Sequence, residues 1–364
     1  MKNQVVISNK QAISLLILFI IGESSIFIEG FEAKKDLWIA IILAIVFTIP
    51  LVLIFARLHV LFPNKNLLDI MEICLGKYLG KALIALYTWF FFHTVVLILE
   101  DIGFFVSTVL FPETPFIIIV IVFALTCTYC VKQGLEVLGR WAEFFIIIPI
   151  VIEILVFLLL IPKMEITNIL PILYDGIGPV AKGTFLTITF PFAYIVGLAS
   201  VFAFSKDKNS PYKIYFSGIL IGGVIVFMSS FKSTLVLGED IGHYFPTYVT
   251  VSRIRIGNFL QRLDILAVIV FMIGIYVEVS AFLLATCIGI TKLFDFADYK
   301  FIVMPITLLI LNICFYEFDS IMHYFEFGRE IWPYYVFPFE IIFPCMLWIT
   351  AEVKIKIKRK KLID

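Results

Sequence analysis

The sequence predicts an all-α polytopic membrane protein with ten transmembrane helices, of which the first and the sixth are broken near mid-depth. Hydrophobic residues make up 62% of the 364 residues and mean hydropathy is +1.06, whereas a soluble domain is about 45–50% apolar. Ten long apolar runs follow one another with mostly short connections, and two of them contain polar or helix-breaking residues. The formal net charge is zero, so composition indicates no nucleic-acid partner.

Each apolar run is near the length that a membrane crossing needs, about 20 residues. The short connections favour a single transmembrane domain over residues 1–364, which ends in a basic cytoplasmic tail at 353–364. With both termini in the cytoplasm, the segments on that side hold most of the Lys and Arg residues, as the positive-inside rule requires. The predicted spans are 11–31, 37–61, 82–110, 115–132, 141–161, 183–204, 212–237, 265–290, 301–316 and 333–352.

Two polar connections have the periodicity of amphipathic helices. In Asn66–Leu79, apolar side chains recur at helical spacing, which predicts a helix lying at the cytoplasmic interface of the membrane. Val249–Leu263 has a similar pattern on the other side, with Ile254, Phe259 and Leu260 opposite several arginines. Either helix could instead pack against a partner subunit.

The first apolar run is interrupted by Gly22, Glu23, Ser24 and Ser25. A broken helix survives in lipid only where protein or a cavity covers its free backbone groups. Free amides at the start of a half-helix attract a carboxylate, and free carbonyls attract an ammonium group or a metal cation. Glu23 would complement an amino group, and the two serines offer hydroxyls. The interruption therefore predicts a binding site for a small solute.

The sixth run supplies a matching interruption at Pro191, which removes one backbone donor and releases a carbonyl. Phe190, Phe192 and Tyr194 surround this proline and are expected to wall an apolar pocket. Breaks in corresponding helices of two halves are typical of transporter binding sites. A proline kink alone is common in membrane helices, so the prediction depends on the two breaks together.

Ionisable residues inside spans are costly and mark candidate functional sites. Glu153 and Glu278 fall nearest the middle of the fifth and eighth spans, where each carboxyl is a candidate for proton or ion coupling. The alternative is a carboxyl satisfied by a neighbouring helix. Asp101, with Glu100 before it, comes late in the third span and is expected to be solvated near the outer surface. Lys232 is expected to extend its ammonium group to the same surface.

The chain contains no pattern typical of a soluble enzyme. The sequence has no Gly-rich phosphate loop, no H-E-x-x-H motif and no nucleophile–base pair. Cys127 and Cys130 form a C-x-x-C inside an apolar run, where cysteines usually act as small hydrophobic residues. We therefore expect no catalytic residue, no metal and no cofactor.

Several short motifs make the chain resemble a known family, the GerAB-like B subunits of GerA-type spore germinant receptors. These motifs extend in order over nearly the whole chain, although none is decisive by itself. They are Ala33-Lys34-Lys35-Asp36-Leu37-Trp38, Leu110-Phe111-Pro112-Glu113-Thr114-Pro115, Gly134-Leu135-Glu136-Val137 with Arg140 and Glu143, Asn168-Ile169-Leu170-Pro171, Thr189-Phe190-Pro191-Phe192, Asn258-Phe259-Leu260-Gln261-Arg262-Leu263-Asp264 and Pro333-Tyr334-Tyr335.

This resemblance implies a member of the amino acid–polyamine–organocation transporter superfamily. The implied fold is a LeuT-like five-plus-five inverted repeat, with repeat one at about 11–161 and repeat two at about 183–352. Residues of the third and eighth helices complete the nutrient pocket of such proteins. Here the expected ligand-binding residues are Gly22, Glu23, Ser24, Ser25, Leu97, Phe190, Phe192, Tyr276 and Ser280.

The resemblance also implies a nutrient sensor in the inner membrane of the spore, beside an A-type membrane subunit and a C-type lipoprotein subunit. An amino acid is the first candidate nutrient. The chain departs from the family pattern at Glu23, where a small residue is usual, and at Glu278, where a lysine is common. Two alternatives remain open: a proton-coupled amino-acid permease, and a scaffold that only anchors other subunits.

Overall fold

The computed structural model describes residues 7–28, 30–204, 209–242, 245–254 and 263–360, and these residues form helices and turns without strands. The α-helices are α1 (Asn9–Ile21), α2 (Leu37–Leu61), α3 (Leu67–Leu75), α4 (Lys77–Phe105), α5 (Phe116–Gln133), α6 (Leu135–Phe145), α7 (Ile147–Leu160), α8 (Ile177–Thr187), α9 (Val196–Ala199), α10 (Ser210–Leu237), α11 (Pro246–Ser252), α12 (Ile265–Leu293), α13 (Val303–Cys314), α14 (Ile321–Glu330), α15 (Trp332–Phe337) and α16 (Phe343–Lys360). Short 3₁₀ and π turns link them, namely η1 (Glu23–Ser25), η2 (Phe31–Asp36), η3 (Val106–Leu110), η4 (Ile161–Lys163), η5 (Ile166–Ile169), η6 (Ile188–Phe192), η7 (Ala193–Ile195), η8 (Gly238–Gly242) and η9 (Pro338–Ile342).

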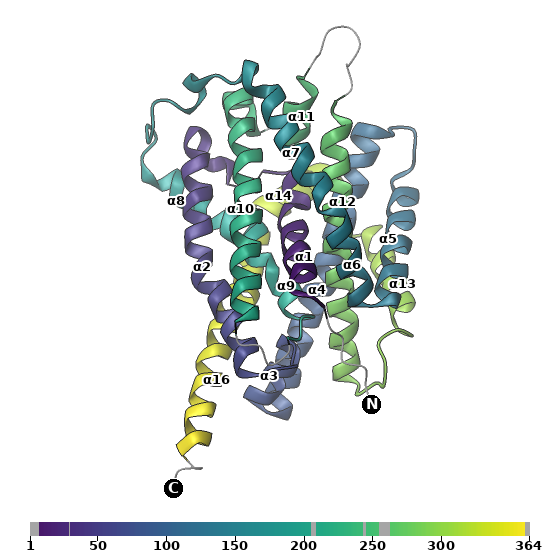
Figure 1. Cartoon of the computed structure of the whole chain (residues 1–364). Coiled ribbons are helices and arrows are strands. Elements are labelled where there is room, and N and C mark those ends of the chain that lie inside the picture. Colours follow the sequence, from purple (N-terminus) through teal and green to yellow (C-terminus); the bar gives the residue numbers. More distant parts are fainter. Residues whose placement is uncertain (1–6, 29, 205–208, 243–244, 255–262, 361–364) are drawn as a thin grey trace.

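The helices form one upright bundle (Figure 1). Within the described residues, eight helical segments are long and apolar enough to cross a membrane, and two apolar helices, α1 and α13, are shorter. α1 is short because its run breaks at Gly22. The predicted span 37–61 coincides with α2, whereas the fifth and sixth spans begin earlier than expected, at Leu135 and Ile177.

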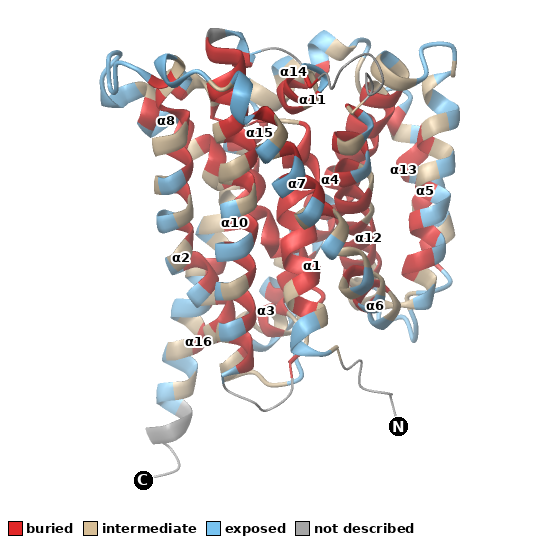
Figure 2. Cartoon of the chain, turned by 45° about the horizontal axis from the view of Figure 1, so that its top comes forward, coloured by how far each residue is buried: buried red, intermediate tan, exposed pale blue. Residues whose placement is uncertain are grey.

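α1 occupies the centre of the bundle, against α10, α12 and α6 (Figures 1 and 2). Small residues on its neighbours allow this close packing: a Cβ at Gly218 or Gly222 of α10 would lie within about 3 Å of Leu16 or Ile20. Glycines at helix contacts let membrane helices approach closely. α4 and α12 run along each other beside α1 and are buried over much of their length. The apolar outer faces of the bundle are exposed, as expected for helices that face lipid.

Both predicted helix breaks are confirmed. α1 stops at Gly22, whose φ of −50° and ψ of −92° are not helical, and the 3₁₀ turn η1 follows. The sixth span leaves helical geometry at Phe190, with φ −146° and ψ 124°, inside η6. The chain then continues through η7 into α9. Glycine and proline thus interrupt the two helices at the residues that the sequence indicated.

One prediction about the segments outside the spans needs correction. The interface helix is shorter than Asn66–Leu79, because Asn66 caps α3 and Gly76 separates it from α4, which takes the remaining residues. Of the second predicted amphipathic segment, Val249–Ser252 lie in α11; residues 255–262, with Phe259 and Leu260, lie outside the described residues. α16 extends through Lys360 and so includes residues 353–360 of the predicted basic tail.

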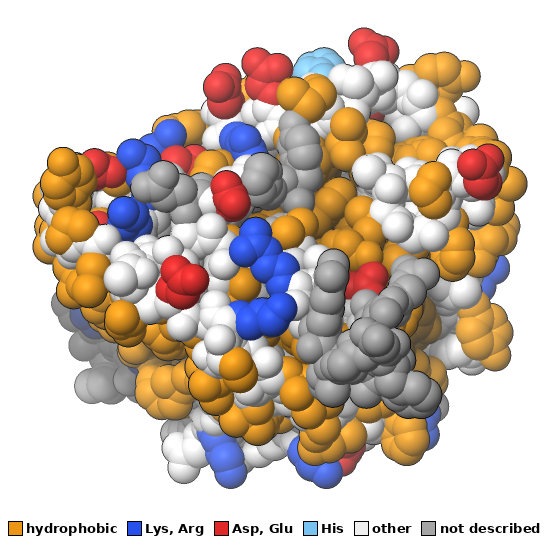
Figure 3. All heavy atoms as spheres, turned by 90° about the horizontal axis from the view of Figure 1, so that it is seen from above, with side chains coloured by type: hydrophobic (Ala, Val, Ile, Leu, Met, Phe, Trp, Pro, Cys, Tyr) orange, Lys and Arg blue, Asp and Glu red, His pale blue; other side chains and the backbone are white. Residues whose placement is uncertain are grey.

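α1 begins and α16 ends at the same end of the bundle, the lower end in Figure 1. This arrangement agrees with an even number of crossings. α11 and α14 lie at the opposite, upper end. Seen from that end, acidic and basic side chains lie scattered among hydrophobic ones (Figure 3). The assignment of the lower end to the cytoplasm remains a prediction from the distribution of Lys and Arg residues.

Candidate ligand-binding site

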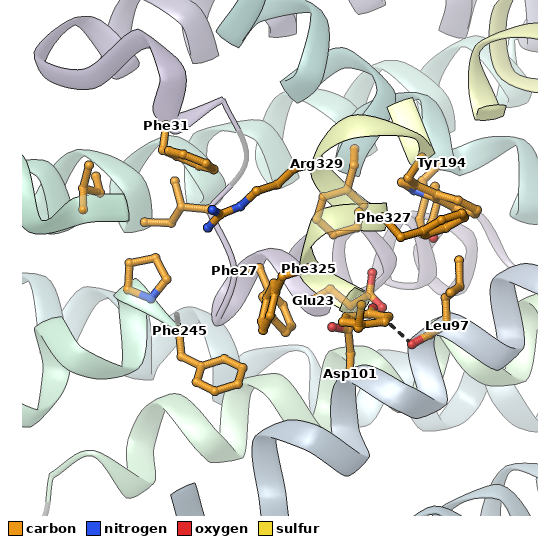
Figure 4. A pocket seen from close by; sticks show the side chains of 17 residues that line it. Glu23, Phe27, Phe31, Leu97, Asp101, Tyr194, Phe245, Phe325, Phe327 and Arg329 are labelled. Carbon is orange, nitrogen blue, oxygen red and sulfur yellow. Dashed lines mark hydrogen bonds between the residues drawn. The ribbon is translucent and has the colours of Figure 1, made fainter. Parts of the chain in front are cut away.

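A cavity of about 90 Å³ lies where the two helix breaks meet α4 and α14 (Figure 4). A water molecule needs about 10–15 Å³ of such space, so the cavity has room for several waters or a small solute. The break in α1 contributes Glu23, and the break in the sixth span contributes Phe190. The other lining residues are Phe27, Ile28, Phe31, Leu97, Asp101, Tyr194, Ile241, Phe245, Pro246, Tyr324, Phe325, Phe327, Gly328, Arg329 and Trp332.

One end of the cavity is acidic. Glu23 and Asp101 are 3% and 8% exposed, and their side chains lie next to each other in Figure 4. Both Glu23 and Tyr324 are within hydrogen-bonding reach of Asp101. The Tyr324 hydroxyl also donates to the carbonyl oxygen of Leu97 at 3.3 Å. Two carboxyls held together away from water favour a ligand group that carries positive charge.

The expectation that Asp101 is solvated is therefore wrong. α4 continues into η3 up to Leu110, and α14 folds over this end of the bundle, so Asp101 and its neighbour Glu100 are both buried. The sequence indicated only that Asp101 lies near the end of an apolar run. It does not show that a later helix, α14, covers this position.

Aromatic rings line most of the remaining wall. Phe27 lies 5.5 Å from Phe245 and 6.1 Å from Phe325 between ring centroids. Tyr194 packs at 5.2 Å, edge on, against Phe190. Aromatic faces bind ammonium groups by cation–π attraction. The acidic end and the rings are thus compatible with the same kind of ligand.

Arg329 extends away from the two carboxyls toward Phe31, and its guanidinium carbon lies 4.6 Å from the centre of that ring (Figure 4). Phe31 and Ile241 also line a second cavity of about 380 Å³, which contains the ion pair of Lys34 with Asp175 at 2.8 Å. The stacked pair of Arg329 and Phe31 therefore lies where the inner cavity borders the larger one. Sequence reasoning missed Arg329, because α14 is too short and too polar to be a span.

At the first helix break, the side chain of Glu278 satisfies a backbone amide that the break leaves free. The backbone N–H of Glu23 donates to both carboxylate oxygens of Glu278, each at 3.3 Å. A Cβ at Gly22 would lie 2.4 Å from Glu278 Oε1, so only glycine permits this approach. The hydroxyls of Ser24 and Ser25 donate to the carbonyl oxygens of Ile20 and Gly22. The expectation that this break offers free amides and hydroxyls to a ligand is therefore not supported by the geometry.

The predicted site residues thus separate into two groups. Glu23, Leu97 and Phe190 line the cavity. The cavity lining does not include Gly22, Ser24, Ser25, Phe192, Tyr276 and Ser280.

Two of these residues face another part of the bundle. The ring of Tyr276 packs at 4.6 Å against Trp141 of α6. Ser280 is fully buried, close to Cys127 and Cys130 of α5. Tyr276 and Ser280 are four residues apart and share one face of α12, which lies against α5 and α6. Glu278, two residues from each, points instead to the first helix break.

Glu153 lies in a different seam of the bundle, between α7 and α10. Its carboxylate accepts a hydrogen bond from Lys232 Nζ at 2.5 Å, and the two residues are 7% and 0% exposed. Lys232 therefore does not extend to the surface as expected. An apolar neighbourhood makes an isolated ammonium costly, and Glu153 supplies the compensating charge.

Comparison with known proteins agrees with the fold. The chain matches the family model described as "Spore germination protein" over residues 6–320. Spore germination protein KB of Bacillus subtilis (strain 168) is 28% identical over 360 residues, which cover 97% of this chain and 96% of that protein. Putative spore germination protein YfkT of the same organism is 24% identical over 330 residues, 89% of each chain.

A solved structure shows a similar arrangement of helices. Mhp1, a nucleobase-cation-symport-1 family transporter in a closed conformation with bromovinylhydantoin bound, superposes with a TM-score of 0.65 and covers 90% of this chain and 76% of that one. At 12% sequence identity, this likeness concerns the fold alone. It confirms the LeuT-like transporter fold. Because the family model covers most of the sequence, this chain is a multi-pass membrane protein of the spore germination permease family.

Proposed function

We propose that this protein is the nutrient-sensing subunit of a spore germination receptor and that it binds a small amine-bearing nutrient, with an amino acid as the first candidate. The family and the transporter-like fold give the general role. One observation carries the specific proposal: the cavity between the two helix breaks combines buried carboxyls of Glu23 and Asp101 with aromatic walls.

The chemistry of the cavity supports this class of ligand. An ammonium group would be paired with Glu23 and Asp101, where water is excluded and opposite charges attract strongly. The rings of Phe27 and Tyr194 would cover its apolar part. A ligand carboxylate would turn toward Arg329, the basic residue of the cavity wall. A sugar would leave the two carboxyls without a cationic partner.

Binding would act on the receptor by shifting the balance between two arrangements of the bundle. A ligand shifts such a balance only as far as its affinities for the two arrangements differ. α14 supplies five cavity residues and lies at the upper end of the bundle, so it would respond to an occupied cavity. We propose that this change is passed to an A-type membrane subunit and a C-type lipoprotein subunit. The chain would lie in the inner spore membrane with both of its termini in the cytoplasm.

The test is a binding screen with the purified full chain in lipid nanodiscs. Thermal shifts are measured with amino acids, other amines, sugars and nucleosides. We expect an amine-bearing compound to stabilise the chain and Asp101→Asn to weaken its binding roughly 10–100-fold, because a hydrogen bond to a charged group contributes about 1.5–3 kcal/mol. Glu113→Gln changes an exposed carboxyl that does not line the cavity and should leave binding unchanged. Stabilisation by sugars alone would contradict the proposal.

A proton-coupled permease remains the second candidate, and buried carboxyls at membrane depth favour it. Uptake of the labelled hit into proteoliposomes separates the two functions. Accumulation driven by a pH gradient indicates a permease, whereas binding without accumulation indicates a sensor. A chain that binds nothing while spores keep their normal response after Asp101→Asn would be a scaffold.

A further inference from the structure

Glu340 is another buried acid that does not line the cavity. It lies in η9, a π turn in the last span, eight residues after the cavity residue Trp332 in the direction of the lower end. Its side chain is fully buried, and neither carboxyl oxygen has a hydrogen-bond partner among the described residues. π turns inside helices are frequent at functional sites.

The surroundings of Glu340 are aromatic. The elements packed against η9 include α4, α15, α16 and η7. The titratable groups that they bring near it are the hydroxyls of Tyr87, Tyr335 and Tyr194 and the thiol of Cys345. The Tyr87 hydroxyl donates to the backbone carbonyl of Phe339 at 2.5 Å, not to Glu340. None of these groups carries a positive charge that would stabilise a carboxylate.

A carboxylate without a counter-ion or a hydrogen-bond donor is very costly in such surroundings, and the group instead takes up a proton and becomes neutral. Glu153 and Glu278 differ from Glu340 in this respect. One is paired with Lys232 and the other with a backbone N–H. Among these three acids in the spans, Glu340 is the one whose charge nothing in the described structure compensates.

A layer of rings separates Glu340 from the cavity. Phe90 stacks on Phe339 with ring centroids 4.7 Å apart, and it also lies 6.2 Å from Trp332 of the cavity wall. Tyr194, which lines the cavity, packs at 5.1 Å against Phe282. Aromatic side chains therefore lie between Glu340 and the cavity in this arrangement.

We propose that Glu340 is a proton-binding site that is loaded in the present arrangement and releases its proton to water at the lower end when that half of the bundle opens. The Glu340 carboxyl would lose H⁺ to water and remain as a hydrated carboxylate. Higher pH on that side would then favour the open arrangement. This inference does not depend on the nutrient and stands whether the chain is a sensor or a permease.

Two measurements on the full chain in nanodiscs test the proposal. The first is the infrared carbonyl band of protonated carboxyl groups at neutral pH, compared between the wild type and Glu340→Gln. The second is the melting temperature of both proteins over a pH series. Glu113→Gln is the matched control, because Glu113 is exposed.

We expect the wild type to have a protonated carboxyl band that Glu340→Gln loses and Glu113→Gln keeps. An unfolded glutamate ionises above about pH 4.3, so a folded state that keeps the proton loses stability relative to the unfolded state as pH rises. The folding equilibrium constant of the wild type should therefore decrease, relative to that of Glu340→Gln, by up to roughly tenfold per pH unit. Its melting temperature should fall relative to that variant in parallel.

Identical carboxyl bands in the wild type and Glu340→Gln would show that Glu340 is ionised and would overturn the proposal. Parallel pH profiles of melting temperature would do the same. If Glu340→Gln does not accumulate, Glu340→Met takes its place, because methionine has a similar length and no titratable group.

Discussion

The seam between α7 and α10 and the seam between α1 and α12 each bury a glutamate at membrane depth, and they satisfy it in opposite ways. In the first seam, Glu153 meets the ammonium group of Lys232 at 2.5 Å. In the second, the Glu278 carboxylate accepts from the backbone N–H of Glu23, just after the helix α1 breaks at Gly22. The Glu153 carboxylate neutralises the charge of Lys232, whereas the Glu278 carboxylate accepts from a backbone amide that the helix break leaves free.

This difference shows that depth in the membrane does not by itself assign a role to an acidic residue. The pair of Glu153 and Lys232 cancels its own charge and lies away from the cavity lining. Glu278 lies at the centre of the transporter-like architecture and fixes the first break against α12. Neither Glu153 nor Glu278 lines the cavity, whereas Glu23 and Asp101, for which we propose ligand binding, do.

The largest expected effect is in the first seam. Lys232→Met should destabilise the protein by about 3–5 kcal/mol, because it leaves the buried Glu153 without its counter-charge. The double variant Lys232→Met with Glu153→Met should recover most of this loss, since apolar residues of similar volume replace buried ion pairs well. The measurement is the free energy of unfolding in detergent micelles or bicelles. A double variant no more stable than the single one would show that the ion pair itself is required.

The second effect concerns the close approach at the first break. Gly22→Ala should cost about 1–3 kcal/mol, as overpacking of a tight core does, because the new methyl group would lie 2.4 Å from Glu278 Oε1. Gly178→Ala in α8 is the matched control: no atom lies within 4 Å of its added Cβ, and alanine favours a helix. Thermal melts compare the two. Equal stability of Gly22→Ala and Gly178→Ala would mean that the break is loosely packed.

The two breaks were predictable from sequence because their causes are local. Gly22 is followed by polar residues, and Pro191 removes a backbone donor within the sixth apolar run, so both features can be seen in the sequence itself. Pro50, which lies inside the continuous helix α2, shows that a proline alone does not predict a break. The bounds of α2 could also be predicted, because a long, mostly apolar run follows Asp36 and ends shortly before Pro63 and Asn64. The lengths of apolar runs therefore determine most of this fold.

The partners of the polar groups were not predictable, because they come from distant parts of the chain. Glu278 and the amide of Glu23 are 255 positions apart, and Lys232 is 79 positions from Glu153. Arg329 reaches the cavity from a short polar helix that has no membrane-spanning pattern. Periodicity shows which face of a helix is polar, but the packing of other helices decides what that face meets.

The smallest expected effect separates the hydrogen bond in the second seam from its charge. Glu278→Gln keeps an oxygen that accepts from the N–H of Glu23 and loses only the strengthening by charge, so it should cost roughly 1 kcal/mol. Glu278→Leu removes the acceptor and leaves that buried amide unsatisfied, which adds about 1–3 kcal/mol. Unfolding free energies of both variants check the order. If Glu278→Leu proves as stable as Glu278→Gln, the amide of Glu23 does not need an acceptor at position 278. The two seams would then differ only in how their side chains pack.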